Sequence, residues 1–200
     1  MKKFCTVLAA AALMTAFFAA PAWASPLKNY DAGRFSVDAG ISLPSSIDGD
    51  NYKLSKSNSS YFGATAGIGS NTALNYKWNN YKADQARTRA QQFNLMYKIL
   101  PGISVYAGYL NADTSSAYGR TENSGQVGLQ ASYDIPLLFT VWGNFGVGRK
   151  NSGYEIGLSK PILNNVELNA SYYDQKFKDA FDNDGDMKAK GVNLGVTVKF

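Results

Sequence analysis

The 200-residue sequence predicts an all-β protein that folds as a single antiparallel up-and-down β-barrel. Two observations lead to this expectation. Apolar and polar residues alternate with period two along most of the chain after residue 34, and no comparable stretch keeps the 3.6-residue period of a helix. Short connections rich in Gly, Pro, Asn and Ser also alternate with longer polar ones, as in a chain of hairpins.

Ten stretches of alternation are expected to form the strands. They lie at residues 35–43, 62–68, 74–78, 93–99, 103–109, 127–133, 139–147, 154–158, 166–172 and 192–200. A strand of about ten residues spans roughly 33 Å, which crosses an apolar layer about 25 Å thick at a tilt of about 40°. The alternative is eight strands, if the hairpin from Ser60 to Lys82 or the one from Phe139 to Lys160 does not form.

The connections predict that both chain ends lie on the same side of a membrane. Tight turns are expected at 70–72, 100–102, 135–137 and 161–165, and longer loops at 44–59, 83–88, 113–124 and 176–188. An even number of strands with tight turns at one end and long loops at the other is the plan of transmembrane β-barrels. A soluble β-sandwich would alternate in the same way. The aromatic residues near the strand ends favour the membrane barrel, as interfacial girdles do: Tyr97, Tyr109, Tyr133, Phe139, Tyr154 and Tyr172.

Residues 1–24 have the pattern of a cleaved secretory signal peptide. Lys2 and Lys3 precede the apolar run Val7–Ala20, and the small-x-small sequence Ala22-Trp23-Ala24 predicts cleavage between Ala24 and Ser25. A retained membrane anchor is the alternative, but the apolar run is short for a spanning helix. The mature barrel domain is then residues 25–200. It has no Cys, because Cys5 lies within the signal.

The C-terminal strand carries a resemblance to a known family. Gly191–Phe200 reads GVNLGVTVKF, an alternating strand that ends in Phe, and on this pattern the chain resembles the Gram-negative outer-membrane β-barrel proteins, in particular the small porin-like barrels. The resemblance implies export through the general secretory pathway, with periplasmic chaperones and the barrel-assembly machinery as partners. It also implies that Phe200 is the signal read by that machinery. The outer-membrane lipid would surround the finished barrel.

Composition excludes several classes of function. The chain contains no His, which removes His-based nucleophilic triads and His-ligated metal sites. Barrel enzymes of the resembled family need a His as general base, so we expect no enzymatic activity, no catalytic residues, no metal and no cofactor. The formal charge of +5 comes without a cluster of Lys and Arg, so no nucleic-acid partner is expected.

Six charged residues are expected to face the lumen, if the apolar face of each strand meets lipid. They are Arg34, Asp38, Lys77, Lys98, Glu155 and Glu167. Side chains just fill the interior of an eight-stranded barrel, whereas a sixteen-stranded barrel encloses an aqueous channel. A ten-stranded barrel lies between these two cases. Inward-facing glycines, such as Gly128, Gly146 and Gly157, would leave space unfilled. The leading expectation is therefore a narrow porin-like channel for passive diffusion of small solutes. Opposite charges could equally pair and plug the bore.

The alternative is a non-conducting structural or adhesive barrel that acts through its extracellular loops. The loops at 45–54 and 176–181 mix aromatic and charged residues, and exposed aromatics can anchor a partner. The Asp182–Asp186 segment resembles the start of a calcium loop, but Met187 stands where the turn Gly belongs and Asn193 where the bidentate Glu belongs. We interpret it as a solvated acidic turn.

Overall fold

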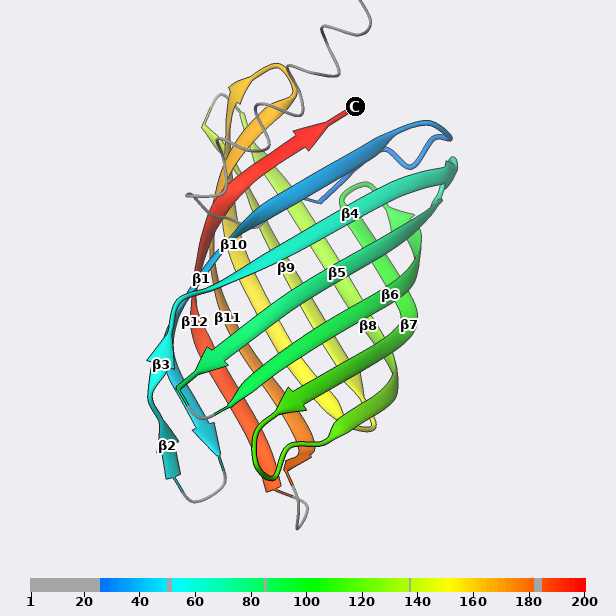
Figure 1. Ribbon diagram of the computed structural model, residues 1–200. Helices are drawn as coiled ribbons and strands as arrows, with labels where there is room; N and C mark the ends of the chain where they lie inside the picture. Colours follow the sequence, from blue (N-terminus) through cyan, green and yellow to red (C-terminus); the bar gives the residue numbers. More distant parts are fainter. Residues whose placement is uncertain (1–25, 50–51, 85, 137, 182–184) are drawn as a thin grey trace, which may run out of the picture.

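The computed structural model describes residues 26–49, 52–84, 86–136, 138–181 and 185–200, and it is a closed antiparallel β-barrel (Figure 1). Ten strands form the ring in sequence order, which confirms the predicted fold class and strand count. They are β1 (Phe35–Gly49), β4 (Ser59–Gly69), β5 (Thr72–Ala83), β6 (Arg87–Leu100), β7 (Ile103–Ser115), β8 (Thr121–Ile135), β9 (Phe139–Gly148), β10 (Asn151–Leu163), β11 (Val166–Phe181) and β12 (Gly185–Lys199). Two short strands, β2 (Tyr52–Leu54) and β3 (Lys56–Ser57), lie outside the ring and pair with β1 and β5.

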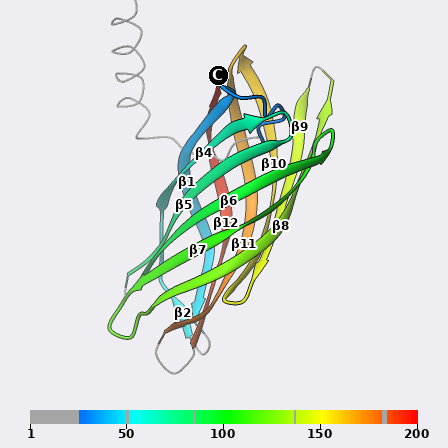
Figure 2. The ribbon, with the colours of Figure 1, turned by 90° about the vertical axis from the view of Figure 1, so that its right-hand side faces the viewer.

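The ring closes where the first strand meets the last. β1 pairs with β12 from Ser36↔Lys199 to Gly49↔Met187. At the rim, the Phe200 backbone N donates to Phe35 O (2.8 Å), and the two rings stack with centroids 4.4 Å apart. A closed ring leaves no unpaired strand edge, and Figure 2 shows its strands inclined to the barrel axis.

The two faces of the wall follow the alternation in the sequence. Large apolar side chains are exposed on the outside of every ring strand, among them Phe62, Leu95, Val127, Ile156 and Leu194. Inward-facing positions are mainly small and polar, such as Asn193 and Thr197, which are fully buried. Soluble proteins rarely expose a continuous apolar surface of this extent. The outer face therefore forms a lipid-facing band.

The strands continue well past this band at the end opposite the termini, which is the extracellular end in the plan of such barrels. β1 runs to Gly49, β11 to Phe181, and β12 begins at Gly185, so much of the expected long loops is strand instead. Continuing the ladder satisfies backbone groups that a loop would leave to water. We call this part, residues 44–49, 79–84, 86–90, 110–124, 173–181 and 185–190, the extracellular extension.

The outer face of the extracellular extension is charged rather than apolar. Lys190 Nζ lies 2.9 Å from Asp174 Oδ2, and Lys176 Nζ lies 2.5 Å from Asp186 Oδ2, on the neighbouring strands β11 and β12. Cross-strand pairs of opposite charge stabilise a solvated sheet face. The change from apolar to charged side chains sets the outer limit of the lipid-facing band.

We expect Phe200→Ala to lower the yield of assembled barrel. It removes the C-terminal aromatic residue that the family resemblance predicts to be the assembly signal, and it removes the ring that stacks on Phe35 at the closing seam. The measurement is the heat-dependent gel mobility of the outer-membrane fraction. Phe139→Ala, at the periplasmic end of β9, removes an aromatic ring but leaves the C-terminus intact, and serves as the control. Normal assembly of Phe200→Ala would contradict the role expected for this residue.

Candidate functional site

The barrel interior contains a layer of buried charge near its centre. Asp38 from β1 and Glu155 from β10 are 7% and 2% exposed. Glu155 Oε1 accepts hydrogen bonds from Ser171 Oγ (2.5 Å) and Asn193 Nδ2 (3.3 Å). Lys77 from β5 lines one small cavity with Glu155 and a second with Asp38, so it is the cation between the two carboxylates. Buried charges of opposite sign in such proximity compensate one another.

The two cavities in this layer are small. Each has a volume of about 20 Å³, close to the space that a single water molecule needs. A solute larger than water does not fit into either of them. The described residues therefore line small polar cavities at the barrel centre.

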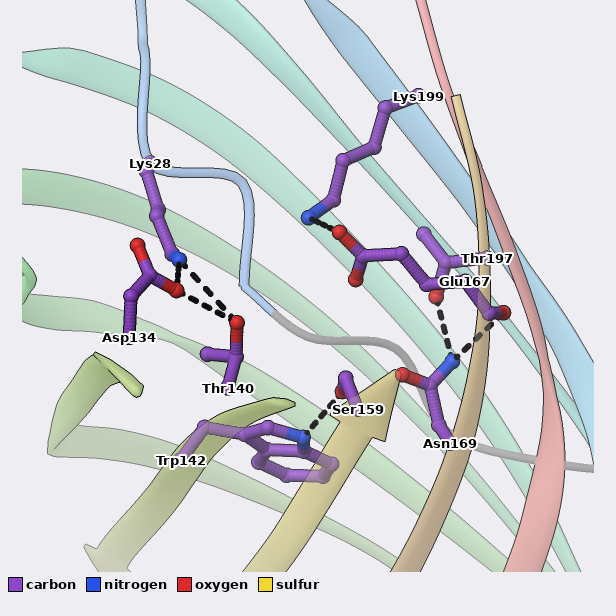
Figure 3. A network of polar contacts seen from close by, with 9 residues as sticks. All are labelled: Lys28, Asp134, Thr140, Trp142, Ser159, Glu167, Asn169, Thr197 and Lys199. Atoms are coloured by element: carbon purple, nitrogen blue, oxygen red, sulfur yellow. Dashed lines mark hydrogen bonds and ion pairs between the residues drawn. The ribbon is translucent and has the colours of Figure 1, made fainter. Parts of the chain in front are cut away.

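Large inward side chains fill the space above the glycines. The Tyr106 ring lies against Gly128 and Gly146, and its hydroxyl donates to Asn144 Oδ1 (2.9 Å). The indole ring of Trp142 covers Gly157, and its Nε1 donates to Ser159 Oγ (2.8 Å), as Figure 3 shows. The expectation that these glycines leave the interior open is wrong. Alternation identifies which residues face inward, but it does not reveal which neighbouring ring reaches across a glycine.

The extracellular end of the interior is closed by an apolar cluster, which we call the extracellular seal. Its members are Ile47, Tyr81, Ala83, Ala86, Ala90, Leu110, Ala112, Tyr173, Phe177, Ala180, Phe181, Met187 and Ala189. The Tyr81 ring lies 5.8 Å from that of Tyr173 and 5.4 Å from that of Phe177, centroid to centroid. A backbone hydrogen bond also joins two sides of the barrel here: Arg120 N, between β7 and β8, donates to Ala180 O on β11 (3.1 Å). Opposite sides of the extension thus meet over a buried apolar core.

The periplasmic end is closed by residues 26–30, which we call the periplasmic seal. Leu27 and Tyr30 are buried with Met96 and Tyr106, and Tyr30 Oη lies 2.9 Å from Ser104 Oγ. Figure 3 shows Lys28 of this segment paired with Asp134 on β8. The segment before β1 therefore folds into the barrel instead of extending away from it.

The structure brings three of the six candidate lumen residues together, namely Asp38, Lys77 and Glu155. Two others lie near the periplasmic end. Lys199 Nζ donates to Glu167 Oε1 (2.6 Å), and Lys98 Nζ lies 5.8 Å from the centroid of the Tyr30 ring.

Arg34, the sixth candidate, is exposed and comes just before β1. The predicted cleavage site at Ala24 and Ser25 lies outside the described residues, as does part of the acidic turn at 182–186.

Sequence reasoning missed several residues that shape the interior. Lys28 and Tyr30 precede the first stretch of alternation, so no sequence pattern indicated which way their side chains face. Asp134 sits at the end of β8, where Thr140 Oγ1 donates to its Oδ1 (2.6 Å). A lone aromatic at a polar position, such as Trp142 between Val141 and Gly143, was the signal that could have indicated a filled lumen.

Two features are absent from the described part of the chain. It holds no group of three or more acidic, His or Cys side chains that could bind a metal ion. Within the same residues, no helix is long and apolar enough to cross a membrane.

A closed ring with a lipid-facing apolar band outside and buried polar groups inside defines the class: an integral outer-membrane β-barrel protein. No protein-family model matches the chain, and no curated protein matches it.

Solved structures of similar fold come from outer-membrane proteins. Neisserial surface protein A is 16% identical over 84% of this chain and 99% of its own, with a TM-score of 0.48. The attachment invasion locus protein Ail of Yersinia pestis is 17% identical over 84% and 99%, with a TM-score of 0.38. The outer-membrane protein AlkL is 12% identical over 89% and 95%, with a TM-score of 0.38.

Lys77→Met is expected to lower the free energy of unfolding by about 3–5 kcal/mol, because it leaves Glu155 and Asp38 buried without the cation that acts on both. Urea unfolding of the refolded barrel in lipid vesicles measures this loss. The double variant Lys77→Met with Glu155→Gln should regain part of it, since the neutral amide needs no counter-ion. Lys160→Met, at an exposed position on β10, is the control and should change stability by about 0.5 kcal/mol or less. A loss of stability in Lys77→Met that is no larger than the loss in Lys160→Met would contradict the expected role of Lys77 in compensating the two buried carboxylates.

Proposed function

We propose that the protein is a sealed outer-membrane barrel that acts at the cell surface through its extracellular extension and conducts no solutes in this state. The observation that carries the proposal is the closure of the interior at both ends. An apolar cluster fills the outer half, and residues 26–30 fill the periplasmic mouth. Between them lie cavities of about 20 Å³, too small for a hydrated ion or a nutrient.

The extension has the properties of a rigid presenting surface. Strands, cross-strand ion pairs and the apolar core of the extracellular seal hold it together, so a partner would bind it without a large ordering cost. The aromatic residues that the sequence suggested as anchors at 176–181 do not serve this role, because Phe177 and Phe181 are buried in the seal. Tyr118, on the connection between β7 and β8, is 70% exposed and is the better candidate for an aromatic contact.

A narrow channel for small solutes is the second candidate. The observation that favours it is the central layer of Asp38, Lys77 and Glu155, since a purely structural barrel does not need three buried charges. Conduction would require both seals to move. The periplasmic seal is the more easily displaced, because it lies outside the strand ladder and few contacts join it to the wall. They include the ion pair of Lys28 with Asp134 and the backbone hydrogen bond from Gly69 N to Tyr30 O (3.2 Å).

Biogenesis forms part of the same proposal. Cleavage after Ala24 would release a chain that begins at Ser25, ten residues before β1. Periplasmic chaperones and the barrel-assembly machinery would then receive it, with Phe200 as the recognition signal. The proposed function includes no enzymatic step and no cofactor.

Planar-bilayer recording of the refolded chain 25–200 tests the proposal. We expect the protein to insert, as shown by its heat-dependent gel mobility, and to give no discrete current steps. The double variant Leu27→Ala with Tyr30→Ala, which loosens the periplasmic seal only, should also remain silent because the extracellular seal persists. Current steps in the wild-type protein that scale with salt concentration would instead establish the channel, and charge reversal at Lys77 or Glu155 would then map its ion selectivity.

A further inference from the structure

The lipid-facing side of the barrel carries an apolar groove with a volume of about 810 Å³ that extends over β1, β4, β5, β6 and β7. Small side chains make it. Ala66 on β4 pairs with Phe35 on one side and Leu74 on the other, and Ala107 on β7 pairs with Leu95. A methyl group between two large side chains leaves a depression in the wall. The groove is far larger than either interior cavity and lies on the opposite face of the strands.

One end of the groove is polar. Gly33 and Arg34 line it at the point where the chain enters β1, next to the closing seam at Phe200. The Arg34 side chain is exposed, and no acidic group among the described residues forms an ion pair with it. The periplasmic border of the membrane lies at this level, because β1 begins and β12 ends here. A guanidinium group at such a border is suited to bind a phosphate with paired hydrogen bonds.

We propose that the groove binds a phospholipid of the periplasmic leaflet, with an acyl chain along Ala66 and Ala107 and the phosphate on Arg34. The groove lies within the lipid-facing band, so acyl chains surround it. A second copy of this barrel would present a convex wall, which does not fill a concave groove. Acyl chains gain no hydrophobic free energy by leaving the bilayer for the protein, so the phosphate contact must supply most of the preference.

Native mass spectrometry of the barrel tests this proposal. The chain 25–200 is refolded in vesicles that contain equal amounts of phosphatidylglycerol and of diacylglycerol with the same acyl chains, and is then extracted into mild detergent. We expect the wild-type protein to retain phosphatidylglycerol in preference to diacylglycerol by about tenfold, the effect of one charge-assisted hydrogen bond of moderate strength. Arg34→Gln should abolish the preference. Lys160→Gln, at an exposed cation on β10, is the matched control and should keep it.

Filling the groove tests the acyl-chain half of the proposal. Ala66→Trp should abolish retention of both lipids, whereas Ala170→Trp, at an exposed alanine on β11, should leave retention unchanged. Ala107→Leu provides a smaller obstruction if the tryptophan variant does not assemble, and should lower retention in the same direction.

The proposal fails if the wild-type protein keeps neither lipid, if it keeps both equally, or if Arg34→Gln retains the preference. A mass that corresponds to two chains, reduced to one by Ala66→Trp, would identify a second copy as the occupant and overturn it as well.

Discussion

The need to pair every backbone group of a membrane-spanning strand governs the rest of this structure. Inside a bilayer no water is available to an unpaired N–H or C=O group, so a sheet can cross only if its first and last strands meet. Here β1 and β12 meet, and the ring of ten strands has no edge. Closure gives each strand one face that points into the barrel interior and one face that contacts lipid. The period-two sequence pattern is the direct expression of that constraint.

The extracellular extension is where this constraint relaxes and a second one begins. Outside the bilayer the strands face water, and their outward side chains become charged. The inward side chains change in the opposite sense, from polar to apolar, with Leu110, Tyr173 and Met187 in place of the serines and asparagines below them. The outer part is therefore organised as a small soluble β-protein on top of a membrane barrel. Its buried apolar core closes the extracellular end of the barrel.

Much of the fold could be predicted from the sequence, because alternation and turn residues are local signals. The strand count, the tight turns and the inward parity of Asp38 and Glu155 all follow from positions counted along one strand. Filling of the lumen could not be predicted in this way. It depends on Tyr106 reaching Gly128 and Gly146 across strands, and on Tyr30 folding back into the mouth. β11 and β12 are longer than the sequence predicts. In the extracellular extension their outward side chains are charged and their inward side chains apolar, which is the reverse of the pattern expected of a membrane strand.

The seam between β1 and β12 also has a consequence for the order of assembly. It joins the two ring strands that are farthest apart in sequence, so its contacts carry the largest loop-closure entropy and are expected to form late. Residues 26–34 lead directly into β1, and the first part of this segment, with Leu27 and Tyr30, lies inside the mouth that this seam completes. The N-terminal segment must therefore be in place before the ring shuts, or thread into it afterwards. The rate of ring closure, relative to the rate at which the N-terminal segment folds into the mouth, thus decides whether a newly assembled barrel is closed at its periplasmic end.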